Sequence, residues 1–100
     1  MEQAQQYVRL AEEATKDNAH VSVLFNYRNA VECAGYVTET APVLLEAVKY
    51  AQRLKKEKDK ATIAVWGIEA LGRIQNTSLA EIINQEIAKL QTGGKESATT

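Results

Sequence analysis

Two segments of this chain echo each other at a fixed separation of 37 residues. The stretch 31–40, VECAGYVTET, aligns without a gap on the stretch 68–77, IEALGRIQNT. Glutamate, glycine and threonine recur identically, and a Val/Ile pair recurs twice. Each copy lies late in one helix-like stretch and precedes another. A period of this length is typical of stacked helical hairpins, which serve mostly as binding surfaces.

The composition supports a single helical domain. One hundred residues are enough for one domain with a modest core. Proline occurs only once, while the helix formers Ala, Glu, Gln, Lys and Leu are abundant. No stretch has the alternating pattern of a β-strand. We therefore predict an all-α domain over residues 1–92, followed by a disordered polar tail at 93–100.

Apolar residues recur at helical spacing in five stretches. These predict helices over 2–16, 18–37, 41–57, 60–75 and 79–91. The stretches 18–37 and 60–75 are apolar on more than one side, which indicates helices sandwiched between neighbours. Gly67 and Gly72 weaken the helix at 60–75, so we expect close helix–helix approach at both. Ser78 and Glu81 match the S-x-x-E capping box and predict the start of the last helix.

The stretch 68–74, IEALGRI, resembles the first helix of a short HEAT repeat, with 79–90 as its second helix. The resemblance covers residues 60–91. The first copy departs from the pattern, because CAGY stands at 33–36 where ALGR is typical. The resemblance implies two stacked αα-hairpins behind a leading helix, a protein-binding role and no catalytic residue. A solenoid usually needs three or more units, so a closed antiparallel bundle of five helices remains the alternative.

The residues that most often carry chemistry are few. His20 is the only histidine and Cys33 the only cysteine, so the chain has no intrachain disulfide. We expect His20 at a helix start or on the surface, and Cys33 as a buried, inert thiol. Glu32 and Glu69 are expected in solvent. Because no phosphate loop, Ser/His/Asp set or HExxH motif occurs, we predict no enzymatic site, no metal and no cofactor.

The net charge of −1 is unevenly distributed. Residues 53–60 carry five basic and two acidic groups. We predict a solvated inter-helix loop here. The alternative is a nucleic-acid-associated accessory protein that contacts phosphates through Arg53, Lys55, Lys56, Lys58 and Lys60. Interleaved aromatic residues, which single-strand binders use for base stacking, are missing from this segment.

Two aromatic residues lie at the margins of apolar stripes. Trp66 has Arg73 on the same side of its helix, and Tyr50 has Arg53 beside it. An aromatic residue at such a margin either belongs to the core or anchors an interface. For the second case, these four are the candidate partner-binding residues. We predict a small non-catalytic protein–protein interaction module: an adaptor, an inhibitor or an accessory subunit. Its partner would be another protein or a second copy in a homodimer. No segment is long and apolar enough to span a membrane, and a cytoplasmic location is expected.

Overall fold

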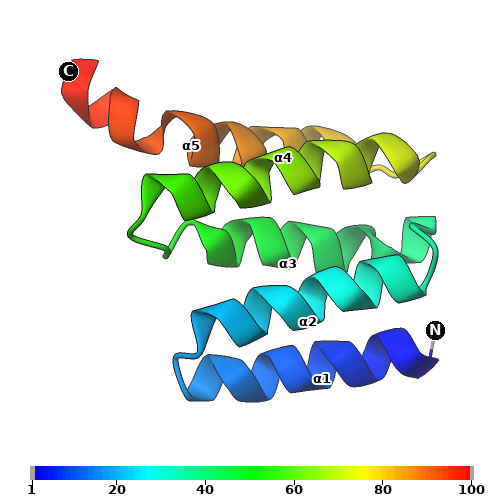
Figure 1. The fold of residues 1–100 in the computed structure, drawn as a ribbon. Helices are drawn as coiled ribbons and strands as arrows, with labels where there is room; N and C mark the ends of the chain where they lie inside the picture. The colour runs from blue at the N-terminus through cyan, green and yellow to red at the C-terminus, as the bar shows by residue number, and fades with distance from the viewer. Residues whose placement is uncertain (1, 100) are drawn as a thin grey trace.

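The computed structural model describes the backbone of residues 2–99 and the side chains of residues 2–91. It contains five α-helices and one short 3-10 helix, and the described residues contain no β-strand (Figure 1). The elements are α1 (Glu2–Lys16), α2 (His20–Cys33), η1 (Thr38–Thr40), α3 (Ala41–Ala51), α4 (Glu57–Arg73) and α5 (Ala80–Thr99). The predicted all-α class with five helices is confirmed.

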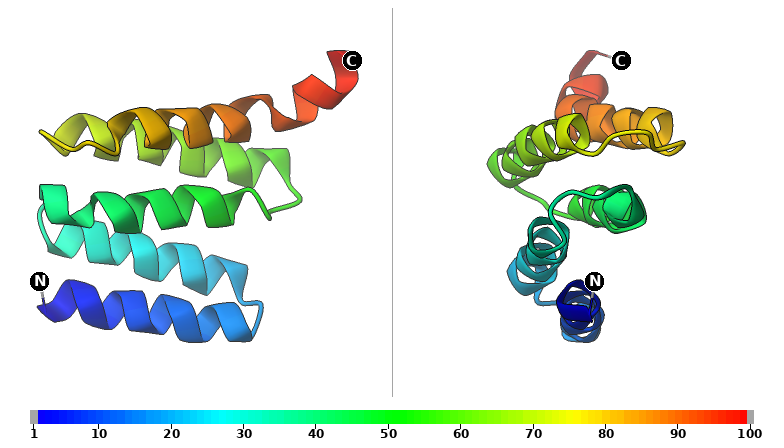
Figure 2. Two further views of the ribbon diagram at one scale, coloured as in Figure 1. Left: turned by 180° about the vertical axis from the view of Figure 1, so that it is seen from behind. Right: turned by 90° about the vertical axis from the view of Figure 1, so that its right-hand side faces the viewer.

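The helices form a thin slab with extents of 45 × 34 × 16 Å between Cα atoms. Helix α1 packs against α2, and α2 packs against α3. Helix α3 also contacts α4 and α5, which pack against each other. Consecutive helices run in opposite directions (Figure 1). Seen along the helices, α2 and α4 lie on one side of the slab, while α1, α3 and α5 lie on the other (Figure 2).

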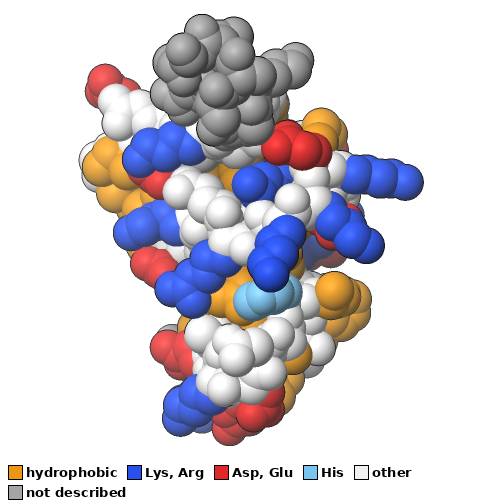
Figure 3. All heavy atoms as spheres, turned by 90° about the vertical axis from the view of Figure 1, so that its left-hand side faces the viewer, with side chains coloured by type: hydrophobic (Ala, Val, Ile, Leu, Met, Phe, Trp, Pro, Cys, Tyr) orange, Lys and Arg blue, Asp and Glu red, His pale blue; other side chains and the backbone are white. Residues whose placement is uncertain are grey.

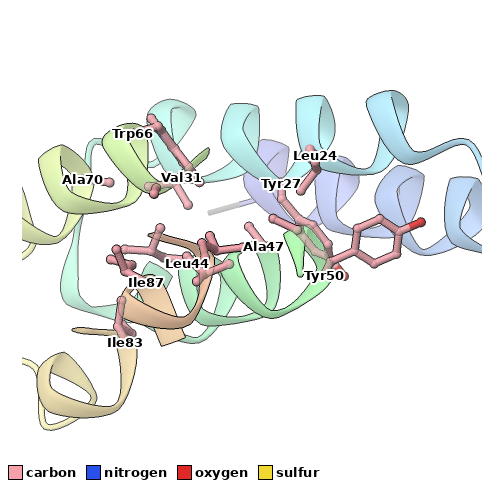
Figure 4. Packing of buried hydrophobic residues seen from close by; sticks show 14 of the residues in the cluster. Leu24, Tyr27, Val31, Leu44, Ala47, Tyr50, Trp66, Ala70, Ile83 and Ile87 are labelled. Carbon is pink, nitrogen blue, oxygen red and sulfur yellow. The ribbon is translucent and has the colours of Figure 1, made fainter. Parts of the chain in front are cut away.

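The core is centred on α3 because this helix has neighbours on three sides. Leu44 and Val48 of α3 are fully buried, and Figure 4 shows Leu44 among side chains from α2, α4 and α5. Pro42 lies in the first turn of α3, where its missing N–H has no intrahelical partner to lose. Thr40 is buried just before α3, and its Oγ1 donates a hydrogen bond to the carbonyl oxygen of Val37 at 2.6 Å.

Helix α2 ends four residues earlier than the predicted range 18–37. Gly35 and Tyr36 adopt φ angles of +73° and +58°, and this left-handed region stops a right-handed helix. Asn18 and Asn76 adopt the same conformation in the turns after α1 and α4. Asparagine tolerates this region better than most residues. The guanidinium carbon of Arg73 lies over the ring of Tyr36, 5.0 Å from its centre, in a favourable cation–π contact.

Other predicted boundaries also differ: α2 begins at His20 and not at residue 18, α4 begins at Glu57 and not at residue 60, and α5 continues to Thr99 beyond the predicted end at residue 91. Helix α3 ends at Ala51 and not at residue 57, and residues 52–56 connect it to α4.

In the turn before α5, Thr77 Oγ1 accepts a hydrogen bond from the backbone N–H of Leu79 at 3.2 Å, and among the described side chains Ser78 forms no hydrogen bond of the predicted capping box. The backbone of residues 93–99 belongs to α5, while the side chains after residue 91 and the whole of residue 100 lie outside the description. The disorder predicted for 93–100 stays a prediction.

The two glycines of the sequence echo have different structures. Gly35 lies beyond the end of α2 in a left-handed turn, whereas Gly72 lies inside α4. The expected close approach is confirmed at Gly67, where an added Cβ would lie 3.2 Å from Ile87 Cδ1. It is wrong at Gly72, where an added Cβ would meet nothing within 4 Å. The two segments nevertheless touch each other: Thr38 Oγ1 donates a hydrogen bond to the carbonyl oxygen of Gln75 at 2.6 Å.

Candidate functional site

The structure places the four candidate partner-binding residues at two separate locations. Trp66 and Tyr50 are each only 7% exposed and belong to the core. Arg53 is exposed and lies 5.1 Å from the ring centre of Tyr50. Arg73 lies at the far end of α4, where it pairs with Glu69 at 3.3 Å. The fold therefore brings Tyr50 and Arg53 together but does not join them to Trp66 and Arg73.

Tyr50 belongs to a polar hollow of about 400 Å³. Its hydroxyl is hydrogen-bonded to Nδ1 of His20, the first residue of α2, at 2.5 Å. Burial raises the pKa of the neighbouring Tyr27 hydroxyl, and the negative charges of Glu46 and Glu12 raise it further. The hollow mixes cations, carboxylates and neutral donors: it is lined by Thr15, Tyr27, Glu46, Lys49, Tyr50, Gln52, Arg53 and Glu86. This mixture of charges favours neither an anionic nor a cationic ligand.

Glu86 is the most strongly hydrogen-bonded carboxylate of this hollow. Its Oε1 accepts from Gln52 Nε2 at 2.7 Å, and its Oε2 accepts from Lys89 Nζ at 2.9 Å. The Gln52 bond is the main reason that the pKa of Glu86 is lowered, and Lys89 lowers it further. Because the pKa of Glu86 is lower in the folded state, its carboxylate stabilises the fold at pH values above the unfolded-state pKa. This contribution to the free energy of unfolding is lost as the pH falls through the folded-state pKa.

Replacing Gln52 by alanine is expected to raise the pKa of Glu86 toward its ordinary value. The reason is that the largest interaction favouring the ionised carboxylate is removed. The Glu86-dependent loss of stability in acid should shrink accordingly. A carboxyl-carbon NMR titration measures the pKa of Glu86 directly. Gln85→Ala, next to Glu86 but exposed, is the matched control. An unchanged Glu86 titration in Gln52→Ala would show that the hydrogen bond has no such role.

The basic segment 53–60 covers one end of the slab. It connects α3 to α4 and includes the first turn of α4. Figure 3 looks onto this end, where Lys and Arg side chains gather around the histidine. Within the part of the chain whose side chains are described, no ion pair involves Lys55, Lys56, Lys58 or Lys60. The segment is therefore an accessible cationic surface, diluted by Glu57 and Asp59.

A second surface was not anticipated from the sequence. Val21 and Phe25 of α2 are 83% and 62% exposed, and Val65 and Ile68 of α4 are 65% and 49% exposed. An open groove of about 270 Å³ lies between the two helices. It is lined by Val21, Leu24, Phe25, Arg28, Leu54, Asp59, Thr62 and Ile63. We call these four exposed residues together with the groove the α2–α4 face.

The α2–α4 face is suited to apolar contact. Six of its eight groove-lining residues are uncharged. Arg28 is already paired with Glu32, its Nε lying 2.9 Å from Oε1. The signal that marks this face is the second apolar stripe in each of the stretches 18–37 and 60–75. We interpreted these stripes as burial between helices, but Val21, Phe25, Val65 and Ile68 correct that interpretation.

The remaining candidate residues are Cys33, Glu32 and Glu69. Cys33 is exposed and not buried as expected, because α2 ends there, and its thiol donates to Gln3 Oε1 at 3.1 Å. Glu32 and Glu69 are exposed, as predicted. Among the described residues, no three His, Cys, Asp or Glu side chains come together in a way that would hold a metal ion.

None of the helices in the described part of the chain combines the length and the hydrophobicity that crossing a membrane requires. Comparisons of the chain with protein-family models, with curated proteins and with solved structures found no significant match.

Proposed function

We propose that this chain is a small non-catalytic interaction module that binds a protein through its α2–α4 face. The observation that carries the proposal is the exposure of four large hydrophobic side chains on α2 and α4, two of which, Val21 and Phe25, line an apolar groove. Single exposed hydrophobic residues are normal on protein surfaces. Exposed hydrophobic residues that line a concave, apolar site, as Val21 and Phe25 do, are typical of interaction surfaces. Such a module would act as an adaptor, an inhibitor or an accessory subunit.

The energetics favour Phe25 as the main anchor. An aromatic side chain contributes a large apolar area at a cost of few rotatable bonds, and aromatic residues are enriched among the residues that dominate binding energies. Burial of apolar area stabilises a complex by roughly 25 cal/mol per Å² before the costs of association. Phe25 combines 62% exposure with a position on the groove wall, so a partner can cover it without rearranging the core.

The second candidate is association with nucleic acid through residues 53–60. Lys55, Lys56, Lys58 and Lys60 favour it, because no ion pair involves them among the described side chains and phosphate contacts come mainly from accessible Lys and Arg. Two features weigh against it. Glu57 and Asp59 interrupt the positive charge, and the neighbouring Tyr50 is too deeply buried to stack on a base.

Affinity capture from host lysate, with and without nuclease, distinguishes the two candidates. The bait is the full chain, compared with a Val21→Glu/Phe25→Glu double variant. Leu10→Glu is the matched control, because Leu10 is 47% exposed on α1, outside the α2–α4 face. We expect a partner that survives nuclease, remains on the control bait and is reduced about tenfold or more on the double variant.

Other capture patterns would contradict the proposal. Equal recovery of the partner on all three baits would show that the α2–α4 face is not the binding surface. Recovery that collapses with nuclease, and with replacement of Lys55, Lys56 and Lys58 by glutamine, would establish the nucleic-acid candidate instead.

A further inference from the structure

The hydroxyl of Tyr27 forms no hydrogen bond among the residues whose side chains are described. Tyr27 is only 8% exposed, and its ring packs in the core beside Tyr50 (Figure 4). Burial raises the pKa of the hydroxyl, as do the negative charges of Glu46 and Glu12, so both carboxylates lie near it. A buried polar group without a partner is uncommon and costs free energy, which a polar group from a ligand would recover.

The hydroxyl of Tyr27 belongs to the polar hollow of about 400 Å³, whose other walls come from α1, α3 and α5 and from the turn after α3. These three helices lie on the same side of the slab (Figure 2). The hollow shares no lining residue with the groove between α2 and α4. Its volume falls within the roughly 300–1,000 Å³ that is typical of small-molecule sites. It is therefore a second candidate site, separate from the α2–α4 face.

Neutral side chains of the hollow are held in place by contacts within the chain. Gln52 Nε2 donates to Glu86 Oε1 at 2.7 Å, and Thr15 Oγ1 donates to the carbonyl oxygen of Ala11 at 2.9 Å. Both side chains keep the capacity to accept a hydrogen bond, Gln52 through its amide oxygen and Thr15 through its hydroxyl oxygen. This part of the wall is suited to an uncharged ligand group that donates, such as an amide or a hydroxyl.

The remaining charged groups of the hollow are not paired with one another. Among the described side chains, no ion pair involves Glu46, Lys49 or Arg53. Glu46 and Lys49 are three residues apart in α3, so their side chains lie on the same face of the helix. The guanidinium carbon of Arg53 lies over the ring of Tyr50, 5.1 Å from its centre. These residues bring one carboxylate and two cations to the hollow that contains the Tyr27 hydroxyl.

A ligand with both charges suits this arrangement better than a ligand with one. A lone anion would face the carboxylate of Glu46, and a lone cation would face Lys49 and Arg53, and such like-charge contacts are unfavourable. A zwitterion forms charge-assisted hydrogen bonds with both sets. In an α-amino acid the ammonium and carboxylate groups are bonded to the same carbon, which matches the adjacent positions of Glu46 and Lys49 on α3.

We propose that this hollow binds a free α-amino acid with a polar, uncharged side chain. The ligand carboxylate lies against Lys49 and Arg53, and its ammonium group lies against Glu46 and the hydroxyl oxygen of Tyr27. The ligand side chain donates a hydrogen bond to Gln52. The proposal does not depend on the proposed function, because the hollow and the groove of the α2–α4 face have no residue in common.

Backbone-amide NMR of the ¹⁵N-labelled full chain tests the proposal. L-Glutamine, L-asparagine and L-serine are each titrated up to about 10 mM, which is enough to detect a Kd of about 1 mM. At least one of the three should give saturable shifts around Tyr27, Lys49 and Gln52, and none at Phe25 or Val65. The N-acetyl form of the amino acid that binds lacks the ammonium charge, and the amide form lacks the carboxylate. Each should bind about tenfold or more weakly.

Two variants each remove one interaction and keep the shape of the side chain. Tyr27→Phe removes only the hydroxyl and Glu46→Gln only the charge, and each should weaken binding about tenfold or more. Glu39→Gln should leave binding unchanged. It is the matched control, because Glu39 is an exposed carboxylate in η1, before the first residue of α3, outside the hollow. Thermal unfolding checks the fold, and Tyr27→Phe should be at least as stable as the original chain, since the hydroxyl has no hydrogen bond to lose.

The absence of saturable shifts with all three amino acids would overturn the proposal. Binding that both variants leave unchanged, or that the N-acetyl and amide forms reproduce, would overturn it as well. Saturable binding of inorganic phosphate without binding of an amino acid would show that the hollow is an anion site instead. None of these results changes the proposed function, because capture of a protein partner is tested on the α2–α4 face.

Discussion

Replacing Leu44 by alanine is expected to lower the free energy of unfolding by about 3 kcal/mol, within the range of roughly 2–5 kcal/mol seen for buried Leu→Ala changes. Leu44 is fully buried in α3, the helix that contacts α2, α4 and α5. Its removal leaves a cavity where side chains from all three neighbours meet (Figure 4). Backbone relaxation cannot fill such a cavity without moving several helices at once.

Denaturant unfolding followed by circular dichroism measures this effect. The experiment is run at low protein concentration, because self-association would add to the apparent stability. Leu10→Ala is the matched control: Leu10 is about half exposed on α1, so its truncation should cost less than about 0.5 kcal/mol. Equal losses for the two variants would mean that α3 is not the centre of the core.

The second large effect is expected at Gly67, where valine should destabilise the fold by about 2 kcal/mol, within the roughly 1–3 kcal/mol typical of overpacking. An added Cβ would already lie 3.2 Å from Ile87 Cδ1 and 3.4 Å from Val48 Cγ2. The further methyl groups of valine therefore enter space that α5 and α3 occupy. Valine's better helix propensity than glycine's offsets only a few tenths of a kcal/mol.

The same substitution at Gly72 is the matched control for Gly67→Val. Gly72 lies on the same helix but faces open space. There valine meets no neighbour, and the expected change in unfolding free energy is about zero or slightly stabilising. Thermal or denaturant unfolding of the two variants compares them directly. A Gly67→Val protein as stable as Gly72→Val would contradict the close packing of α4 on α5.

Local signals in the sequence were sufficient to predict the number and order of the helices. The main apolar stripes are the buried ones, as Leu44 and Val48 of α3 and Ile83 and Ile87 of α5 illustrate. Helix ends were less predictable. The end of α2 is followed by Gly35 and Tyr36, both in the left-handed conformation. Glycine at 35 is a residue type that indicates a helix end, whereas tyrosine at 36 is not.

The candidate site was predictable only in part. Periodicity shows that Val21, Phe25, Val65 and Ile68 form second stripes on their helices, but it does not show whether another helix covers them. That depends on how many helices the chain has and how they stack. Periodicity also leaves Trp66 and Tyr50 undecided. Their places at the margins of the wheel are compatible with the core or with an interface, and neighbouring helices bury both.

Site-specific photo-crosslinking in the host tests most directly whether the α2–α4 face contacts protein. Phe25 is replaced by p-benzoylphenylalanine, an aromatic residue of related shape, and the same residue at Leu10 is the control. We predict a discrete protein adduct from position 25, either a second copy of the chain or another protein, and none from position 10. No adduct from position 25, or the same adducts from both positions, would contradict the account.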